Sequence, residues 1–278
     1  MPGPDARTGT GGGRSSGHPT GPPGGVEATD GPVRVRIRYA KVGKVRFTGH
    51  RDVVRMWERA FRRSGLRVAW SEGFSPHPLI SFGLALPTGA ESRAEYLDVV
   101  LRDAPQVDDL PERLSELLPA GVDAHVVGIL GKEAGSLQQE VSSCSWKLEV
   151  LGLAAGELAS RVERLLAAPS VLVERERKGR VVHDDLRPAV LSLATSLTDD
   201  ALGAGGRAGG VWIAAELATR PRGVRPRELL GGLGPEVALS RACRMHQWIE
   251  RDGAWWEPLE HGGDGTRVGA THAEERAS

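Results

Sequence analysis

Three arginines near the start of the expected folded region are spaced so that, in a strand, they could bind phosphate together. Arg34, Arg36 and Arg38 occupy alternate positions of the run 33–39, and apolar residues occupy the others. This period of two predicts a strand with all three guanidinium groups on one face. A guanidinium group can bind phosphate through two N–H donors and can stack on a base. We therefore expect these arginines, with Lys41 and Arg46 nearby, to form an RNA-binding surface on the open face of a sheet.

Charge along the chain is strongly uneven, although Lys+Arg and Asp+Glu both total 36. Residues 31–80 contain twelve basic and three acidic residues, a net charge of +9. Residues 81–140 contain four basic and eleven acidic residues, a net charge of −7. The zero total excludes a general polycation, so any nucleic-acid site must be a local patch. The basic segment could concentrate phosphate polymer, or it could pair internally with the acidic segment.

Two segments present histidines in unusual contexts. His50 follows Gly49 at the expected start of a helix, and the loop 71–78 holds His77 between two prolines. The two histidines could transfer protons or bind phosphate, but hydrogen-bonding loop residues are the more ordinary interpretation. A metal site with Asp52 lacks a recognisable ligand spacing, so we predict neither a metal nor a cofactor. The expected site-shaping residues of these segments are Gly49, His50, Gly73, Phe74 and His77.

A second basic cluster lies far along the chain. Arg220, Arg222, Arg225 and Arg227 precede or begin a short expected helix that starts at Pro226. These arginines could hold phosphate at the helix start, or they could simply lie in water. The run 183–188 contains two adjacent carboxylates, Asp184 and Asp185, which could bind a metal or share a proton. Adjacent residues of a strand point to opposite faces, so we interpret this run as a capped turn.

The order of expected elements predicts the fold class. The run 44–47 is expected to be a short strand, and apolar periodicity predicts a helix over residues 50–64 with an arginine stripe opposite its apolar face. Residues 171–177 and 180–182 predict a hairpin. Both halves follow roughly a β-α-β-β-α-β order, which predicts an α+β protein with two ferredoxin-like (split βαβ) layers in tandem.

These elements give four expected segments. Residues 1–30 and 261–278 are poor in large apolar side chains and are expected to be disordered. Residues 31–131 and 143–260 are expected to form the first and second α+β domains.

Several classes of protein are excluded by composition. Two cysteines cannot form a disulfide framework, a four-cysteine zinc site or a three-cysteine iron–sulfur anchor. No stretch has the character of a membrane span or a secretory signal, so a cytoplasmic protein without a membrane partner is expected. No nucleotide-binding P-loop, nucleophile elbow or zinc-protease motif is present.

Several runs resemble the uncharacterised bacterial radical-SAM-linked domain family, which occurs alone or fused C-terminal to B12-binding radical SAM proteins. The resemblance covers about residues 32–255 and is most specific within 36–98. The runs that carry it are Arg36-x-Arg38-Tyr39-x-Lys41-x-Gly43-x-x-Arg46-Phe47-x-Gly49-His50-x-Asp52, Arg59-Ala-x-Arg62-Arg63-Ser-Gly65, Ser71-Glu-Gly-Phe-Ser-Pro-His-Pro78, Leu86-Pro-Thr-Gly89 and Glu95-Tyr96-Leu-Asp98.

The resemblance implies that the protein acts together with a partner protein, but it does not indicate which reaction is carried out. It suggests an accessory role beside a B12-binding radical SAM protein, and the gene neighbourhood of the family, near ribosomal proteins and an RNA-processing ribonuclease, favours RNA. The expected function is an RNA-binding accessory in RNA processing or modification. One alternative is a module that docks to, or presents substrate to, a radical SAM enzyme. Another is an enzyme that uses His50 and His77, so whether the protein is an enzyme stays open.

Overall fold

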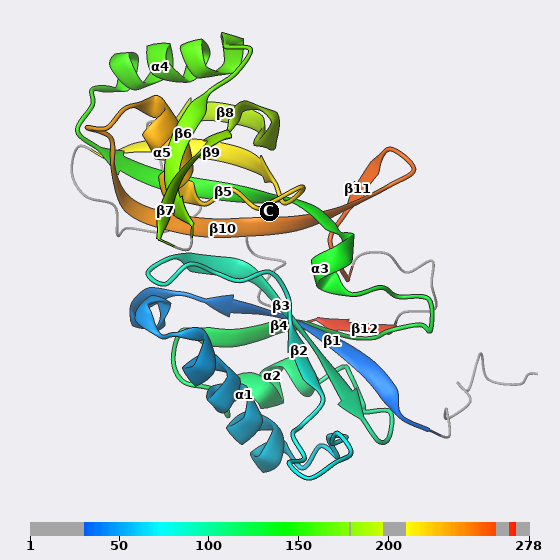
Figure 1. Ribbon diagram of the computed structural model, residues 1–278. Helices are drawn as coiled ribbons and strands as arrows, with labels where there is room; N and C mark the ends of the chain where they lie inside the picture. The colour runs from blue at the N-terminus through cyan, green and yellow to red at the C-terminus, as the bar shows by residue number, and fades with distance from the viewer. Residues whose placement is uncertain (1–30, 178, 197–209, 260–266, 271–278) are drawn as a thin grey trace, which may run out of the picture.

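The protein is an α+β molecule in which one large sheet passes through both halves of the chain (Figure 1). The computed structural model describes residues 31–177, 179–196, 210–259 and 267–270. The expected disorder of residues 1–30 lies outside the described residues, as do 261–266 and 271–278 of the expected tail. Residues 267–270 of that tail form a strand, which corrects the prediction there. None of the helices in these ranges has the length and apolar character to cross a lipid bilayer.

The first half places two helices on one face of four strands. Its strand order is β4-β1-β3-β2, with every neighbouring pair antiparallel. Side chains of α1 and α2 pack with β1, β3 and β4 in one apolar core. The elements are β1 (Val33–Lys41), the 3₁₀ helix η1 (Gly43–Phe47), α1 (His50–Ser64), β2 (Ile80–Phe82), β3 (Glu91–Leu101), α2 (Leu110–Ser115) and β4 (Val122–Ile129).

The second half repeats this arrangement with an added hairpin. Its strand order is β10-β5-β9-β8, again antiparallel, and β6 pairs with β7 as predicted. A second apolar core contains side chains of α4, α5 and these strands. The elements are α3 (Leu137–Glu140), β5 (Val141–Leu151), α4 (Ala155–Ala167), β6 (Leu172–Arg177), β7 (Arg180–Asp185), η2 (Arg187–Ala189), β8 (Val190–Ser196), β9 (Val211–Ala218), α5 (Pro226–Leu233), β10 (Ala238–Arg251) and β11 (Ala254–Trp256).

The two halves are joined through a shared sheet edge, a connection that the sequence did not indicate. The first residues of β3 pair in parallel with β10, at Glu91 with Cys243 and at Ser92 with Arg244. The far edge of the first half is extended by β12 (Arg267–Ala270), which pairs with β4. The described strands of both halves, apart from the β6–β7 hairpin, thus form one 10-stranded sheet. One apolar core lies within the first half, and the other is built mainly from the second half but includes Ala94, Tyr96 and Val126 of the first.

The helix α1 forms where the periodicity of the sequence predicts it. Val53, Trp57, Ala60 and Phe61 are buried on one face, and the arginines lie opposite. The helix ends at Gly65, whose φ of 76° is a left-handed conformation that favours glycine. The expected strand over 44–47 is wrong, because these residues form η1.

Candidate functional site

The sheet-face arginines do not face open space. Arg36 is only 1% exposed and donates two hydrogen bonds to Asp98, at 2.7 Å from Nε and 3.0 Å from Nη2. Its remaining donors bind the carbonyl oxygens of Gly135 and Pro258. The side chain of Arg38 is 12% exposed and lies 3.4 Å from Glu257. The expectation of an open phosphate-binding face is therefore wrong for these two arginines.

Chain segments remote in sequence cover this face. Arg34 donates to the carbonyl of Ala134 in the segment 130–140 that connects β4 to β5, here called the joint, and its side chain is one-third exposed. The joint and the segment after β11 supply the carbonyls that satisfy the arginines. A buried guanidinium with its donors paired is stable in place, so a phosphate would have to displace Asp98 to reach Arg36.

Lys41 is also part of the interior. Its side chain donates to the carbonyl of Thr48 at 2.9 Å and more weakly to that of Arg46 at 3.4 Å. Burial lowers the pKa of Lys41, and the nearby charge of Glu95 opposes that shift. This lysine holds the turn between β1 and α1 instead of reaching solvent.

Glu91 joins the two halves through three hydrogen bonds. Its carboxylate accepts from the backbone N–H of Gly43 at 2.9 Å, from Arg46 Nη1 at 3.1 Å and from Arg241 Nη2 at 2.9 Å. Burial raises the pKa of Glu91, but the hydrogen bonds from Arg241 and Gly43 outweigh it, so the pKa lies below its ordinary value. Together with Arg36 and Asp98, this pairing supports the internal-pairing alternative for part of the basic segment.

The loop 71–78 is closed by its own hydrogen bonds. Ser71 N–H donates to the carbonyl of His77 at 2.9 Å, and the Ser71 hydroxyl accepts from the His77 backbone N–H at 3.1 Å. Ser71 Oγ and His77 Nδ1 also lie 2.8 Å apart. Gly73 has a φ of 119°, and Phe74 at the tip is fully exposed. His77 thus serves as a hydrogen-bonding loop residue.

His50 takes part in a different contact. It begins α1, after Gly49 as N-cap, and its ring packs edge-to-face on Phe82 with centroids 5.1 Å apart. Among the contacts of the described residues, no hydrogen bond or ring contact joins His50 to His77. In the part of the chain that the structure describes, no group of three or more His, Cys, Asp or Glu side chains is arranged to hold a metal ion.

One group of solvent-exposed basic residues lies on the outer side of α1 and on the segments beside it. The exposed arginines of this surface, here called the α1 face, are Arg51, Arg55, Arg59, Arg62, Arg63, Arg67 and Arg102. Arg55 pairs with Asp52 and Arg67 with Asp103, in each case between two exposed side chains. The other five have no ion pair with any described residue. Ion pairs between exposed side chains contribute little to stability and are easily exchanged. Nearly all arginines of the α1 face are therefore available to a polyanion.

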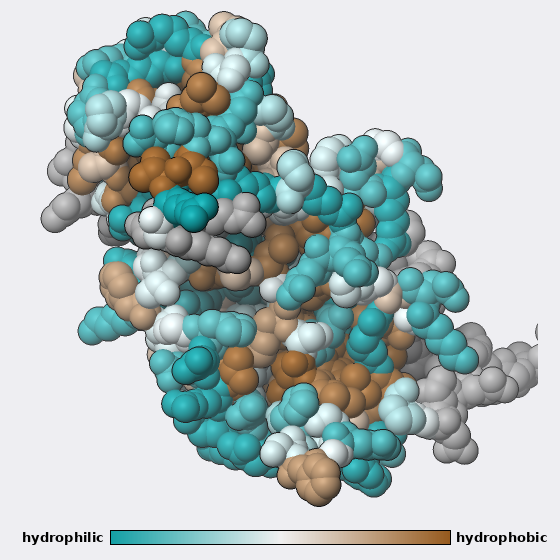
Figure 2. Space-filling model, in the orientation of Figure 1, coloured by the Kyte–Doolittle hydropathy of each residue, from teal (hydrophilic) through white to brown (hydrophobic). Residues whose placement is uncertain are grey.

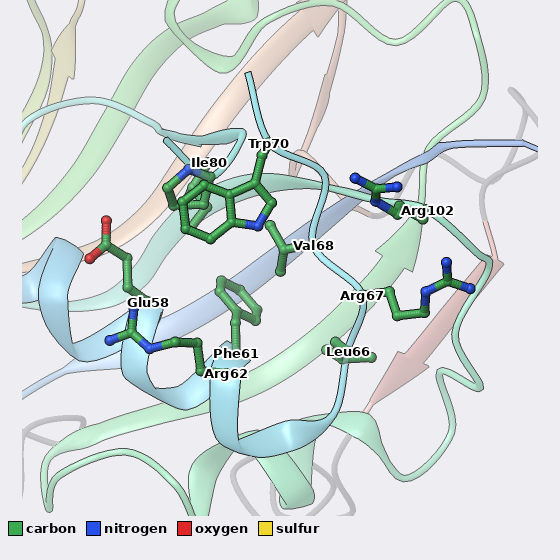
Figure 3. A pocket seen from close by; sticks show the side chains of 10 residues that line it. Glu58, Phe61, Arg62, Leu66, Arg67, Val68, Trp70, Ile80 and Arg102 are labelled. Atoms are coloured by element: carbon green, nitrogen blue, oxygen red, sulfur yellow. The ribbon is translucent and has the colours of Figure 1, made fainter. Parts of the chain in front are cut away.

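A groove beside α1 adds an aromatic side chain to this face (Figure 3). The groove has a volume of about 360 Å³ and runs between the end of α1 and the segment 66–70. Trp70 is 46% exposed, and its indole lies over Ile80 and Val68. Arg67 and Arg102 lie on one side of it and Arg62 with Glu58 on the other. Figure 2 shows apolar surface next to α1, bordered by hydrophilic atoms.

Sequence reasoning missed this groove. It names neither Trp70 nor Arg102, because only folding brings the end of α1, the segment 66–70 and the end of β3 together. The available signal was a tryptophan at the edge of a proline-rich polar loop, a context in which a large aromatic residue has no obvious core to join.

A second concave site lies between the halves. A cavity of about 770 Å³ is lined by η1, the segment 84–90, β5, β9, β10 and the start of α5. Two runs that carry the family resemblance meet at its wall, because the N–H of Gly89 donates to the carbonyl of Arg46 at 2.8 Å. Arg225 and Arg227 of the second basic cluster also line it. Arg222 instead pairs with Asp184 and Glu228.

Comparison with known proteins identifies a family for this chain. Residues 34–219 match the model of the family described as "Uncharacterized protein conserved in bacteria (DUF2344)". No curated protein matches the chain. The matched region includes β1 to β9 and therefore both the α1 face and most of the wall of the inter-half cavity. Because the match covers more than half of the sequence, the chain belongs to this bacterial family.

Proposed function

We propose that the protein binds single-stranded RNA through the α1 face and the adjacent Trp70 groove, as an accessory in RNA processing or modification. The observation that carries the proposal is the combination of unpaired, exposed arginines with an exposed tryptophan in one groove. Proteins that bind single strands combine a positive surface for the backbone with aromatic side chains on which bases stack.

The charges of the α1 face suit a flexible phosphate backbone. The five arginines without a carboxylate partner keep their donors for phosphate, and the two exposed pairs cost little to exchange. Glu58 is the carboxylate at the edge of the groove, and it limits how closely phosphate can approach Arg62. This arrangement favours a base over the groove and phosphates along the helix.

The fold gives a reason why the helix side, and not the sheet side, would be used. The strand orders of the halves support the inference that each half is a ferredoxin-like unit, a layer type that often binds RNA on its open sheet face. In the first half that face is covered by the joint and by the segment that holds Pro258. The surface of the first half that remains available to a polyanion is therefore the side formed by α1.

Removing the aromatic platform should weaken RNA binding. We expect Trp70→Ala to reduce affinity for a short unstructured RNA by roughly 5- to 150-fold, because stacking of one base on an aromatic ring contributes about 1–3 kcal/mol. Fluorescence anisotropy with a labelled oligonucleotide measures the change. Trp255→Ala is the matched control, because Trp255 is 47% exposed but lies in β11. Equal affinities of the two variants would contradict the groove assignment.

A second candidate function is docking to a protein partner through the loop 71–78. The specific observation is Phe74, fully exposed at the tip of a loop that is held closed by Ser71 and His77. A rigid, protruding aromatic residue is a typical anchor of a protein interface. The family resemblance suggests a B12-binding radical SAM protein as the partner.

The docking candidate predicts a strong effect of one side chain. We expect Phe74→Ala to weaken binding to the B12-binding radical SAM protein of the same bacterium by about 30-fold, as loss of an interface hot spot does. Surface plasmon resonance with ribonuclease-treated proteins gives the affinity. Val181→Ala, an exposed apolar residue on β7, should leave it unchanged. Docking that survives Phe74→Ala in full would exclude this loop as the anchor.

A further inference from the structure

We infer that the cavity between the two halves binds a small phosphomonoester with a planar ring, such as a nucleoside monophosphate. Its volume of about 770 Å³ falls within the range typical of small-molecule sites. This site differs from the α1 face, since none of the exposed arginines of that face lines it. The inference therefore goes beyond RNA binding and does not depend on it.

The wall of the cavity is held in place from both halves. Arg244 on β10 is 3% exposed and donates to the carbonyls of Leu84 and Ala85 at 3.1 and 3.0 Å, and to Glu95 at 2.9 Å. These bonds fix the segment 84–90 of the first half against the second half. A wall that is already ordered loses little freedom when a ligand enters.

The charge of the cavity points to a ligand with about two negative charges. Four arginines and no carboxylate are among the described residues that line it. Arg244 is paired with Glu95, and Arg46 is paired with Glu91, a carboxylate that it shares with Arg241 outside the cavity lining. Arg225 and Arg227 have no ion-pair partner among the described residues. A phosphomonoester, whose second pKa is near 6, carries the matching charge at neutral pH.

The position of these two arginines strengthens the preference for phosphate. They flank Pro226, the first residue of α5, where the helix dipole adds positive potential. The carboxylate of Glu228 in the first turn is already occupied by Arg222 at 2.8 Å and by the N–H of Arg225 at 3.1 Å. It therefore does not neutralise the Arg225 and Arg227 side chains.

The rest of the lining combines apolar side chains with the hydroxyl groups of Thr88, Thr219 and Ser240, and its aromatic member, Trp146, is only 4% exposed. Leu86, Leu217 and Leu239 line the cavity, together with the indole of Trp146, over which the guanidinium of Arg244 stacks at 5.0 Å. Burial raises the pKa of Cys144 to about 11, so its thiol is neutral and extends the apolar wall. A planar ring suits this surface better than a sugar or a short peptide, because its faces need no hydrogen bonds.

Calorimetric titration of the purified full-length protein tests the inference. The probes are AMP, GMP, CMP and UMP, with the corresponding nucleosides and inorganic phosphate. We expect at least one nucleotide to bind, and its nucleoside to bind at least roughly 10-fold more weakly, because the phosphate supplies the charge-assisted bonds. Arg225→Gln with Arg227→Gln should weaken the nucleotide by a similar factor. Ala85→Trp, which fills the cavity from an exposed position, should abolish binding.

A control on the α1 face separates this inference from the proposed function. Arg59→Gln with Arg62→Gln should leave nucleotide affinity unchanged while weakening RNA, and the cavity variants should do the reverse. The inference is overturned if no nucleotide binds, if inorganic phosphate binds as tightly as the nucleotides, or if Arg225→Gln with Arg227→Gln leaves affinity intact. Nucleotide binding that persists in a folded Ala85→Trp protein, judged by circular dichroism, would also place the ligand elsewhere.

Discussion

An Asp98→Ala variant is expected to lose about 3–5 kcal/mol of unfolding free energy, because it leaves the buried guanidinium of Arg36 without its carboxylate. The carbonyls of Gly135 and Pro258 still accept hydrogen bonds but carry no charge. Glu140 lies 3.9 Å from Arg36 Nη1 and also pairs with Arg251, so it replaces Asp98 only in part. Urea denaturation monitored by tryptophan fluorescence measures the change in midpoint. A loss of this size is a large fraction of the stability of an ordinary domain.

Two further variants show whether the buried pair is the cause. Asp103→Ala removes a carboxylate from the exposed pair with Arg67 and should change stability by less than about 1 kcal/mol. Replacing both members of the buried pair, Arg36→Met with Asp98→Leu, should recover much of the loss, because no unpaired charge remains. An Asp98→Ala protein as stable as Asp103→Ala would show that Arg36 is not held as described.

Reversing charge on the α1 face is expected to cause the largest loss of RNA affinity. The variant with Arg59→Glu, Arg62→Glu and Arg63→Glu should bind short single-stranded RNA roughly 100-fold more weakly, on the order of 1 kcal/mol for each lost phosphate contact. The slope of log affinity against log salt should also fall by about 2, because each phosphate contact on a single strand contributes about 0.7. Anisotropy titrations at several salt concentrations give both quantities.

A control with the same net charge separates a specific face from general attraction. Arg164→Glu, Arg180→Glu and Arg220→Glu remove three exposed arginines of the second half. This control should lower affinity only slightly and leave the salt slope nearly unchanged. If both triple variants lose affinity to the same extent, RNA is attracted by the net charge of the molecule and the α1 face has no special role.

The elements that sequence predicted well are those with a strong local period. The alternation in β1 and the apolar arc of α1 are encoded within a few residues; α1 spans the expected residues, and β1 extends two residues beyond the expected run. The hairpin of β6 and β7 was likewise predictable, because two strand-type runs flank a short turn in the sequence. The run 44–47 failed because tertiary contacts set its conformation: Glu91 binds the N–H of Gly43, and Lys41 binds the carbonyl of Thr48.

The sheet-face prediction failed for a non-local reason. Alternation correctly separates the arginines of β1 from its apolar residues, but it does not tell whether the second face meets water or protein. Here the answer depends on Ala134, Gly135 and Pro258, which lie about 100 to 222 residues from the arginines they contact. No pattern within the strand encodes such a contact.

The two concave sites were beyond sequence reasoning for the same reason. The cavity between the halves needs Arg46, Leu86 and Arg225 to meet, and these residues belong to separate elements of different halves. The groove at Trp70 needs the end of α1 to approach Arg102. The sequence did indicate that Arg225 and Arg227 could bind phosphate, but it did not indicate which other residues would face them across a cavity.

Photocrosslinking tests the proposed RNA site most directly. A short single-stranded RNA containing 4-thiouridine would be crosslinked to the purified protein, and the modified peptides identified by mass spectrometry. The account predicts crosslinks within residues 59–70 and at Trp70 in particular, which disappear in the Arg59→Glu, Arg62→Glu, Arg63→Glu variant. Crosslinks confined to the second half, or none at RNA concentrations that saturate binding, would contradict it.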